Sequence, residues 1–519
     1  MNPTALLLRF KNLPRLLLHA VVTLTLIAPS SALSDEGKRD LDANGSVILA
    51  APADKEIANA LSHIDPAEIE KTIAALVSFH NRSTVSSMDT DLPKGQGVTA
   101  AADWIESTFE AYSKECGGCL EVKRDTFTEP PQTGPHPRIT QPTTISNVYA
   151  ILRGSDPKQA SRIVLVTGHY DSRNSDTMDM HDEAPGANDD ASGVAVSLAC
   201  AHALSKLKLP ATLIFAAVAG EEQGLNGSAH LAKLAKSEGW NLEAVLNNDI
   251  VGGNTTPGDT LQDKSVVRVF SESIPANATP EEMRATLRLG YESDSPSREE
   301  ARAIADVARS YERAIGPVRP GVKASADFHP ILEFRQDRFL RGGDHSSFNQ
   351  QGFAAVRFTE WREDFNHQHQ NVRTENGVEY GDLVKFVDFN YVARVARLNA
   401  ATLATLAAAP PPPADPRVVV KNLDNSTTLH WKDGAGAPEG TAYEIVWREL
   451  AAPDWQRWSI AWHPTLRDEA AKDGAPALRG SDGTYSIILP ISKDNVIFGI
   501  RSVDAAGHRS VAVAPVPER

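Results

Sequence analysis

Strongly apolar segments that alternate with helical patterns constrain the fold of this chain more than any other feature. Three of them are apolar on both alternating faces, namely RIVLVTGHYD, ATLIFAAVAG and EAVLNNDIVG, and a fourth, ISNVYAILRG, precedes them. A strand without a polar face belongs in a sheet that is covered on both sides. The sequence therefore predicts an α/β domain over residues 64–409, with a mixed, largely parallel sheet and helices on both faces.

The N-terminal residues have the features of an export signal. Three cations precede the apolar run LLLHAVVTLTLIA, and small residues offer a cleavage site at Ala32. We therefore expect a signal peptide at residues 1–32, with an uncleaved N-terminal anchor as the alternative. Residues 33–63 are polar and mixed, and we expect a loosely ordered leader there.

The pattern changes after residue 409. PPPPADP at residues 410–416 predicts a stiff proline-rich linker. Short alternating strands separated by turn signals fill residues 417–519 and predict a C-terminal all-β sandwich. This segment resembles a fibronectin type III module, with Trp431 in the place of its core tryptophan and Phe498 where that module has a tyrosine.

Charge and hydropathy exclude some functions and bear on location. The formal net charge of −15 argues against nonspecific nucleic-acid binding, which needs a basic surface. After the first apolar run, none is long enough for a membrane span, so we expect no stable span once the signal is removed. These features predict an exported protein, in the periplasm, at the cell surface or in the medium.

Three cysteines are too few for a four-thiolate zinc site. Cys116 and Cys119 lie in ECGGC, which in a cytosolic protein would suggest a redox pair or half of a zinc site. In an exported chain the same spacing favours a small local disulfide between them. Cys200 lies in an apolar helical pattern, where we expect a buried free thiol.

Side chains that can bind metals follow the predicted strands. His169 ends one strand, Glu221 and Glu222 follow another, Asp249 follows a third, and Asp189 precedes a helical pattern. The carboxyl ends of strands meet at one edge of an open α/β sheet, so we expect these side chains to converge. Taken singly they have plainer interpretations, His169 as a polar residue at a strand end and Asp189 as the cap of the following helix.

The donor set suits zinc, manganese or cobalt, because imidazole nitrogen and carboxylate oxygen are present without thiolate, and zinc is the commonest of these metals for hydrolysis. Two ions are favoured over one, because so many carboxylates would crowd a single ion. A carboxylate shared by two ions holds them roughly 3.5–4 Å apart, the separation of co-catalytic pairs. The sequence thus predicts two zinc ions per chain.

Four motifs, taken in order, resemble those of the di-zinc exopeptidases of metallopeptidase clan MH: GHYDS, PGANDDASG, GEEQGLNGS and NNDIVGG. The resemblance covers roughly residues 66–405, and secreted bacterial aminopeptidases are the closest type. It implies these roles: zinc ligands His169, Glu222 and Asp249, bridging ligand Asp189, and general base Glu221. It also implies a cis peptide bond between Asp189 and Asp190.

The remaining ligand is predicted from NHQHQNVRT, which matches the family's Tyr-His-Thr-x-x-Asp-Thr stretch. His369 stands five residues before Thr374, as the ligand would, and His367 is the alternative. Gln368 replaces the tyrosine and Arg373 the aspartate, so the surroundings of this ligand depart from the family pattern.

Three further residues have expected supporting roles. Asp171 follows His169 by two residues and would accept a hydrogen bond from its imidazole, with a turn-stabilising role as the alternative. RGGDHSSF resembles the family's S-D-H-x-P-F stretch, so Asp344 would brace the cleft or fix the loop. The family often stabilises the oxyanion with a tyrosine, which no motif places here, and Tyr291 is the candidate.

The resemblance implies a zinc-dependent aminopeptidase that acts on peptides with a free N-terminus, through a metal-activated water and Glu221 as the base. A carboxypeptidase on the same fold is an alternative, for which Arg341 and Arg362 are candidates to bind the substrate carboxylate. A glutaminyl cyclase or a non-catalytic binding protein would have lost some of the predicted ligands, which argues against both.

Overall fold

The computed structural model describes residues 39–316, 327–462 and 477–518. The predicted signal peptide at residues 1–32 and the start of the expected leader lie outside the described residues. Residues Asp40–Arg519 form one compact unit. No described helix is both long and apolar enough to cross a membrane.

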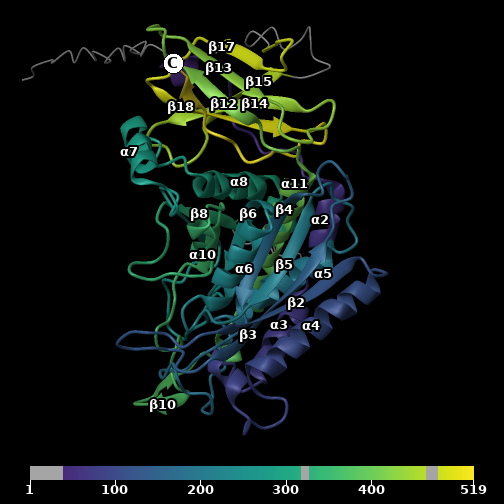
Figure 1. Cartoon of the computed structure of the whole chain (residues 1–519), viewed down its shortest axis with the longest axis vertical. Coiled ribbons are helices and arrows are strands. Elements are labelled where there is room, and N and C mark those ends of the chain that lie inside the picture. Colours follow the sequence, from purple (N-terminus) through teal and green to yellow (C-terminus); the bar gives the residue numbers. More distant parts are fainter. Residues whose placement is uncertain (1–38, 317–326, 463–476, 519) are drawn as a thin grey trace, which may run out of the picture. The chain divides into compact units, whose positions relative to one another are not determined.

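An eight-stranded mixed sheet forms the centre of the α/β domain (Figure 1). Its strand order is β2-β3-β5-β4-β6-β9-β7-β8, in which β5–β4, β4–β6, β6–β9 and β7–β8 are parallel and the other neighbours are antiparallel. The strands are β2 (Leu120–Glu129), β3 (Thr143–Leu152), β4 (Arg162–His169), β5 (Thr212–Val218), β6 (Asn241–Asn248), β7 (Val266–Ser271), β8 (His329–Glu333) and β9 (Val356–Glu360). The predicted fold class is therefore confirmed.

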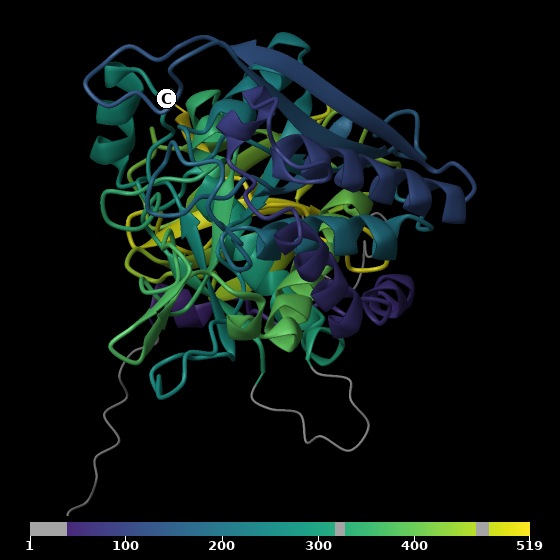
Figure 2. The same cartoon turned by 90° about the horizontal axis from the view of Figure 1, so that it is seen from below.

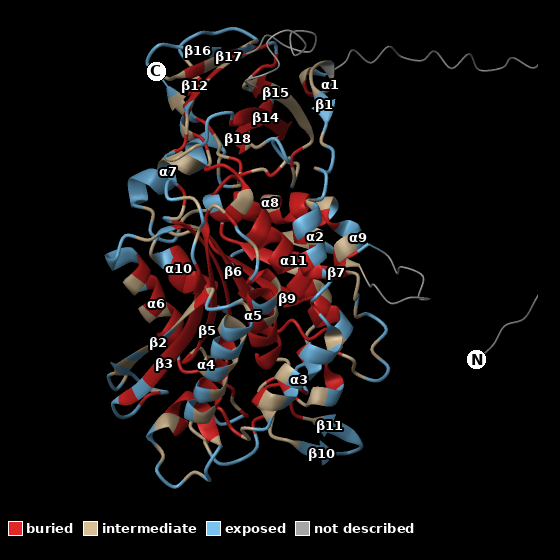
Figure 3. Cartoon of the chain, turned by 90° about the vertical axis from the view of Figure 1, so that its right-hand side faces the viewer, coloured by how far each residue is buried: buried red, intermediate tan, exposed pale blue. Residues whose placement is uncertain are grey.

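Helices cover both faces of this sheet, which is why β4 and β5 are buried along their whole length (Figure 3). Val164 and Val166 share a core with α3, α4, α5 and α11, whereas Ile163 and Leu165 face α6 and α10. The main helices are α3 (Pro66–Val77), α4 (Gly97–Glu115), α5 (Ala191–Leu204), α6 (Asn226–Ser237), α8 (Pro296–Ser310), α10 (His345–Gln350) and α11 (Phe389–Ala408).

Helix α4 lies along the antiparallel pair β2–β3 at the edge of the sheet, in blue in Figure 2. A disulfide between Cys116 and Cys119 closes the turn from α4 into β2, and Cys200 in α5 is a buried free thiol. The shorter elements of the domain are η1 (Thr84–Met88), α7 (Pro280–Leu289), α9 (Glu312–Ile315), β10 (Arg373–Glu375), β11 (Val378–Tyr380) and η2 (Val384–Phe386).

Two sheets make up the C-terminal part, with strand orders β1-β15-β14-β18 and β16-β17-β13-β12-β19. Trp431 and Tyr485 belong to the same sheet and stack on each other. Trp431 also packs against Tyr443 of the other sheet, so the two sheets share one core. The strands are β1 (Ser46–Val47), β12 (Ala414–Val419), β13 (Thr427–Lys432), β14 (Ala442–Glu449), β15 (Arg457–Trp462), β16 (Leu478–Arg479), β17 (Tyr485–Leu489), β18 (Val496–Val503) and β19 (Val516–Glu518). This is the predicted sandwich, and its kinship with fibronectin type III modules stays a prediction.

Residues 40–63 differ from the loosely ordered leader expected for residues 33–63. Helix α1 (Asp40–Ala43) places Leu41 in the core of the sandwich, and β1 pairs with β15. Helix α2 (Lys55–Leu61) buries its apolar side chains in the core of the α/β domain. The polar composition of the segment conceals this, because its few apolar side chains are the ones that pack.

The proline-rich segment at residues 410–416 is also integrated into the fold. Pro410 and Pro411 are buried, and the Ser502 hydroxyl donates a hydrogen bond to the Pro411 carbonyl at 2.7 Å. Strand β12 already begins at Ala414. The segment predicted as a stiff linker thus packs against the sandwich instead of spanning solvent.

Candidate metal centre

Polar groups follow three adjacent strands of the central sheet. His169 is the last residue of β4, Asp249 directly follows β6, and Glu221 and Glu222 come shortly after β5. Since β5, β4 and β6 are neighbours and run parallel, these strand ends lie at the same edge of the sheet. The fold therefore brings together residues that are distant in the sequence.

Potential ligand atoms at this edge form two groups of three, and within each group all atoms lie within 4.8 Å of one another. The first group is His169, Glu221 and Asp249, and the second is Asp189, Glu222 and His369. Asp189 links the groups, because its Oδ1 is 3.1 Å from His169 Nε2 and its Oδ2 is 3.0 Å from His369 Nε2. His369 Nε2 also lies 3.0 Å from Glu222 Oε1.

Asp190, and not Asp189, caps helix α5. The Asp190 carboxylate accepts hydrogen bonds from the backbone N–H groups of Gly193 at 2.9 Å and His169 at 3.0 Å. The peptide bond between Asp189 and Asp190 is cis. The interpretation of Asp189 as a plain helix cap is therefore wrong, and its carboxylate stays with the cluster.

The loop that carries Asp189 is held by Asp382, a residue that no sequence motif marked. The Asp382 carboxylate accepts hydrogen bonds from the backbone N–H groups of Asn188 at 2.9 Å and Asp189 at 2.7 Å. Burial raises the pKa of Asp382 to about 7. Asp382 comes shortly after β11, so only the folded chain reveals this contact.

Asp171 is fully buried beside the cluster. Its Oδ1 lies 3.4 Å from His169 Nδ1, and its Oδ2 accepts hydrogen bonds from the Glu222 backbone N–H at 3.1 Å and the Thr84 hydroxyl at 2.9 Å. One carboxylate therefore contacts the imidazole ring and also fixes the backbone of the glutamate pair. Both interpretations of Asp171, support for His169 and stabilisation of a turn, have a counterpart in the structure.

The two candidate histidines near residue 368 occupy different environments. His369 has a positive φ of 56° and directs its Nε2 to Asp189 and Glu222. His367 stacks on Phe386 with 3.7 Å between ring centroids, outside both groups. Only His369 is therefore placed to act with the other candidate ligands.

The electrostatics of the cluster favour a bound cation. Burial raises the pKa of Glu221 well above its ordinary value, and the neighbouring Glu222 and Asp249 add to the rise. Burial lowers the pKa of His369, yet Glu222 and Asp189 outweigh it and raise this pKa to about 10. So many carboxylates out of water need a compensating positive charge.

Two atoms of the cluster test whether the side chains fit a metal. His169 Nε2 and Glu222 Oε1 are buried, and neither has a hydrogen-bond partner of acceptable geometry among the described residues. These two atoms therefore lie close to Asp189 and His369 without forming hydrogen bonds to them. Converging imidazole nitrogens and carboxylate oxygens, without thiolate, are a donor set that zinc accepts.

Comparison with known proteins agrees with this geometry. The sequence profile of Peptidase family M28 matches residues 147–376, a segment that contains every residue of the two groups. A probable zinc metalloprotease of Pyrenophora tritici-repentis (strain Pt-1C-BFP) is 40% identical over 476 residues, which cover 91% of this chain and 89% of that protein. The chain belongs to peptidase family M28.

Other relatives are similar over most of their length. A probable zinc metalloprotease of Pyricularia oryzae (strain 70-15) is 42% identical over 479 residues, which cover 91% of this M28 chain and 87% of that protein. Among solved structures, the LapA aminopeptidase of Legionella pneumophila is 20% identical with a TM-score of 0.45, covering 70% of this chain and 77% of that one. Both metalloproteases are fungal, and the bacterial type stays a prediction.

One departure of this M28 chain from the motif pattern, Gly343, lies against a buried arginine. Arg357 of β9 is fully buried, and its Nη2 lies 2.8 Å from Asp249 Oδ1. Gly343 stands where the resemblance has a serine, and a Cβ at this position would lie 2.5 Å from Arg357 Nη1. The glycine therefore makes room for the guanidinium. Sequence reasoning missed Arg357, because a single arginine in a predicted strand carries no motif.

Asp344 is buried at the start of α10. Burial raises its pKa to about 7, and neither carboxylate oxygen has a hydrogen-bond partner among the described residues. Its expected role in bracing the cleft stays a prediction.

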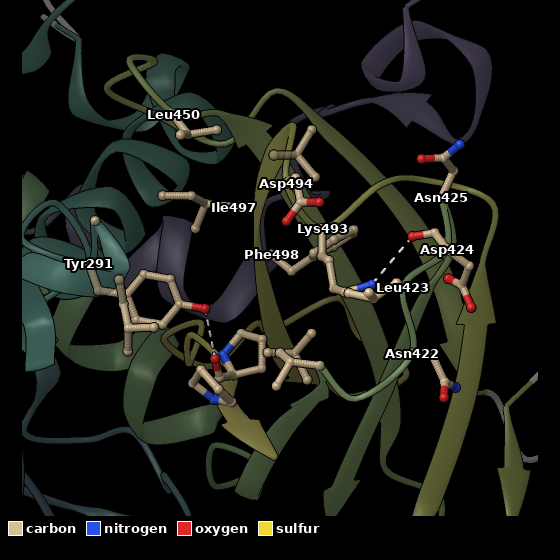
Figure 4. A pocket seen from close by; sticks show the side chains of 17 residues that line it. Tyr291, Asn422, Leu423, Asp424, Asn425, Leu450, Lys493, Asp494, Ile497 and Phe498 are labelled. Atoms are coloured by element: carbon tan, nitrogen blue, oxygen red, sulfur yellow. Dashed lines mark hydrogen bonds between the residues drawn. The ribbon is translucent and has the colours of Figure 1, made fainter. Parts of the chain in front are cut away.

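Tyr291 lies away from the metal centre, so its assignment as the oxyanion-stabilising residue is wrong. It lines a separate pocket of about 580 Å³ together with Lys493 and Phe498 of the sandwich (Figure 4). Its hydroxyl donates a hydrogen bond to the Pro515 carbonyl at 3.0 Å. None of the residues of the two metal-competent groups lines this pocket.

A cleft of about 560 Å³ opens onto the metal centre. Asp189, Glu221, Glu222, Asp249 and His369 line it. Of the two arginines considered for binding a substrate carboxylate, only Arg341 lines this cleft. Arg362 instead pairs with Asp259 at 2.9 Å, on the wall of another pocket.

Proposed function

We propose that this M28 metalloprotease is a two-zinc aminopeptidase that removes the N-terminal residue of peptides. The observation that carries the proposal is the pair of ligand groups that Asp189 links at an open cleft. A non-catalytic scaffold or a one-metal enzyme has no need for both groups. The choice of the N-terminal residue follows from the resemblance of the four motifs to those of aminopeptidases.

The side chains divide between two ions in this proposal. His169 and Asp249 would hold one zinc, Glu222 and His369 the other, and Asp189 would be shared. Zinc, when bound, supplies a Lewis acid and lowers the pKa of water into the neutral range. The backbone carbonyl of Asp171 accepts a hydrogen bond from His169 Nδ1 at 3.1 Å, with the Asp171 carboxylate 3.4 Å from the same nitrogen, which leaves Nε2 as the electron-pair donor.

Glu221 is the base in this proposal. It lines the cleft and belongs to the same group as His169 and Asp249, so its carboxylate would face a water activated there, with Asp189 taking its place in the ligand set. It takes a proton from the attacking water and delivers it to the nitrogen of the leaving amine. Both transfers need only one carboxylate that faces the scissile bond.

A carboxypeptidase is the second candidate, because Arg341 lines the cleft and could bind the terminal carboxylate of a substrate. Hydrolysis of free-amine peptides and of their N-acetylated counterparts separates the two activities. We expect only the free-amine peptides to be cleaved. Cleavage of the N-acetylated peptides from the C-terminus would instead support the carboxypeptidase.

The Glu221→Ala variant tests the role of the base. We expect turnover to fall by roughly a hundredfold or more, since general-base catalysis contributes on this order, while zinc content stays at about two ions per chain, as in co-catalytic sites. Full activity in this variant would exclude Glu221 as the base. Loss of zinc together with activity would make it a ligand instead.

We also infer that the protein is exported. The signal-like N-terminus and the Cys116–Cys119 disulfide support this location, because disulfides persist in oxidising compartments. Detection of the mature chain outside the cytoplasm, with its N-terminus near residue 33, tests it.

A further inference from the structure

Four arginines line the cleft above the metal centre. They are Arg138, Arg173, Arg338 and Arg341. The acidic residues that line the same cleft are Asp189, Glu221, Glu222 and Asp249, and all of them belong to the two metal-competent groups. Once metal ions neutralise those carboxylates, the remaining charges that face the cleft are cationic, although the chain as a whole has a net charge of −15.

Arg338 is the one arginine whose charge is already balanced. Its guanidinium pairs with Asp337 at 3.0 Å and with Glu363 at 2.7 Å, and its side chain is only 9% exposed. We therefore regard Arg338 as part of the wall of the cleft.

Arg341 is held in place with much of its charge free. Its Nη1 donates a hydrogen bond to Gln368 Oε1 at 3.1 Å, and its guanidinium lies over Phe365. The nearest carboxylate, from Glu363, is 3.5 Å away and is shared with Arg338 at a shorter distance. Gln368 in turn donates to Asp189 at 2.9 Å, so Arg341 is tied to the shared ligand through one side chain.

Arg138 and Arg173 are anchored by backbone oxygens only. Arg138 Nη1 donates to the Glu222 carbonyl at 2.8 Å, and Arg173 Nε donates to the Asn174 carbonyl at 3.0 Å. Among the ion pairs of described residues, none includes either arginine. A guanidinium has five N–H donors, so most donors of both side chains remain available to a ligand.

We propose that this cleft selects peptides with a carboxylate within one or two residues of the scissile bond, and that Arg341 and Arg138 bind this group. The inference rests on the proposed peptidase function and adds a substrate class to it. A guanidinium matches a carboxylate through two parallel N–H···O contacts, which gives both strength and orientation. The carboxylate has two possible sources, an acidic side chain or the C-terminus of a short peptide.

Three matched substrate pairs distinguish these sources with the zinc-loaded full chain. The pairs are Glu-Ala-amide with Gln-Ala-amide, Ala-Glu-amide with Ala-Gln-amide, and Ala-Ala with Ala-Ala-amide. In at least one pair we expect kcat/KM to be roughly ten- to a hundredfold higher for the member with the carboxylate, as for other hydrogen bonds to charged groups. The pair that responds identifies the source, and equal rates within all three pairs would overturn the proposal.

Variants show whether the arginines cause the preference. In Arg341→Gln and Arg138→Gln, we expect the ratio of kcat/KM for the carboxylate substrate to kcat/KM for its neutral partner to fall by roughly tenfold. Arg362→Gln, in the same region but outside the cleft, should change neither value. If Arg341→Gln and Arg138→Gln both keep the preference, these two arginines do not produce it.

A further measurement separates this proposal from the peptidase function. Calorimetry compares the binding of glutarate with that of glutaramide to the zinc-loaded protein and to an Arg138→Gln/Arg341→Gln variant of equal zinc content. We expect glutarate binding to weaken by about tenfold or more in the variant. If the variant binds glutarate more weakly but the parent hydrolyses no peptide, the peptidase function is refuted and the anion site stands. If the parent hydrolyses peptides but the variant binds glutarate as the parent does, the peptidase function stands and the anion site is refuted.

Discussion

Arg357 Nη2 lies 2.8 Å from Asp249 Oδ1, while Nη1 of the same guanidinium lies 3.3 Å from Asp337 Oδ2. All three side chains are buried. Burial and the nearby Arg338 lower the pKa of Arg357, but Asp249 and Asp337 outweigh them, so the net shift is upward and the guanidinium keeps its charge. A candidate zinc ligand is thus oriented by a fixed cation behind it.

Replacing this arginine should be costly. Arg357→Met leaves Asp249 buried without its arginine and Asp337 with Arg338 as its remaining arginine, and we expect the free energy of unfolding to fall by about 3–5 kcal/mol. Arg357→Lys keeps the charge and should lose less. Chemical denaturation of the three proteins measures the order, and a methionine variant as stable as the parent would contradict it.

Asp171 provides a second test, of metal affinity. Asp171→Asn keeps the size of the side chain but removes the negative charge beside His169 Nδ1, so we expect zinc to bind roughly ten- to a hundredfold more weakly. Competition with a chromogenic chelator measures the affinity. Asp176→Asn, in the same loop but exposed, is the matched control and should bind zinc as the parent does.

The strand ends of the metal centre could be predicted from the sequence because each is a local pattern. His169 ends an apolar run, and Asp249 follows another, so the parallel sheet alone dictates that they meet. His369 was predicted from the family motif and not from any periodicity. The alternative of Asp189 as a helix cap could not be dismissed from the sequence, because an Asp-Asp pair before a helix does not say which carboxylate caps it and which one faces the cluster.

The supporting residues could not be predicted, because their partners are far away in the sequence. Asp382 contacts the backbone of Asp189 from 193 residues further along the chain. Arg357 is a charged residue inside a buried strand, and only the space at Gly343 explains it. Leu41 was missed for a similar reason, since one apolar side chain in a polar stretch carries no pattern.

Removing the metal should destabilise the fold and not only abolish activity. Without cations, the carboxylates of both ligand groups repel one another in a buried site, so we expect a chelator to lower Tm by several degrees and zinc to restore it. Differential scanning calorimetry with metal analysis measures both. Magnesium should not replace zinc, because it is a poor partner for imidazole. An unchanged Tm after complete metal removal would contradict this expectation.

Glu272 predicts a pH dependence that is independent of the metal centre. Burial raises its pKa to about 7 from an ordinary value of 4.5. Ionising it in the folded state is therefore unfavourable, and the cost grows as pH rises from the unfolded value through the folded value. The Ala276 N–H donates a hydrogen bond to Glu272 Oε2 at 3.0 Å. Glu272→Gln keeps an oxygen for this bond and removes the cost of ionising the side chain.

We therefore expect Glu272→Gln to leave stability unchanged near pH 4 and to raise it by about 1–3 kcal/mol near pH 8. Urea denaturation of the variant and the parent at both pH values measures the difference. A gain of the same size at both pH values would mean that the titration of Glu272 is not its cause.

Asp306 of α8 links the α/β domain to the sandwich. Its Oδ2 lies 3.0 Å from Arg501 and 3.3 Å from Arg509, and the three side chains are at most 11% exposed. Burial raises the pKa of Asp306, but the arginines outweigh it and hold this pKa below its ordinary value. The contribution to stability is therefore present at neutral pH and is lost as pH falls through the lowered pKa.

Asp306→Asn should reduce the free energy of unfolding by about 3–5 kcal/mol at pH 7, because it leaves two buried arginines short of a partner. Asp454→Asn is the matched control. Asp454 pairs with Arg309 at 2.7 Å and also joins the α/β domain to the sandwich, but the Arg309 side chain is 40% exposed. Exposed pairs contribute about 0–1 kcal/mol, so the control should change little. Equal effects of the two substitutions would show that the sandwich is not held by the buried network.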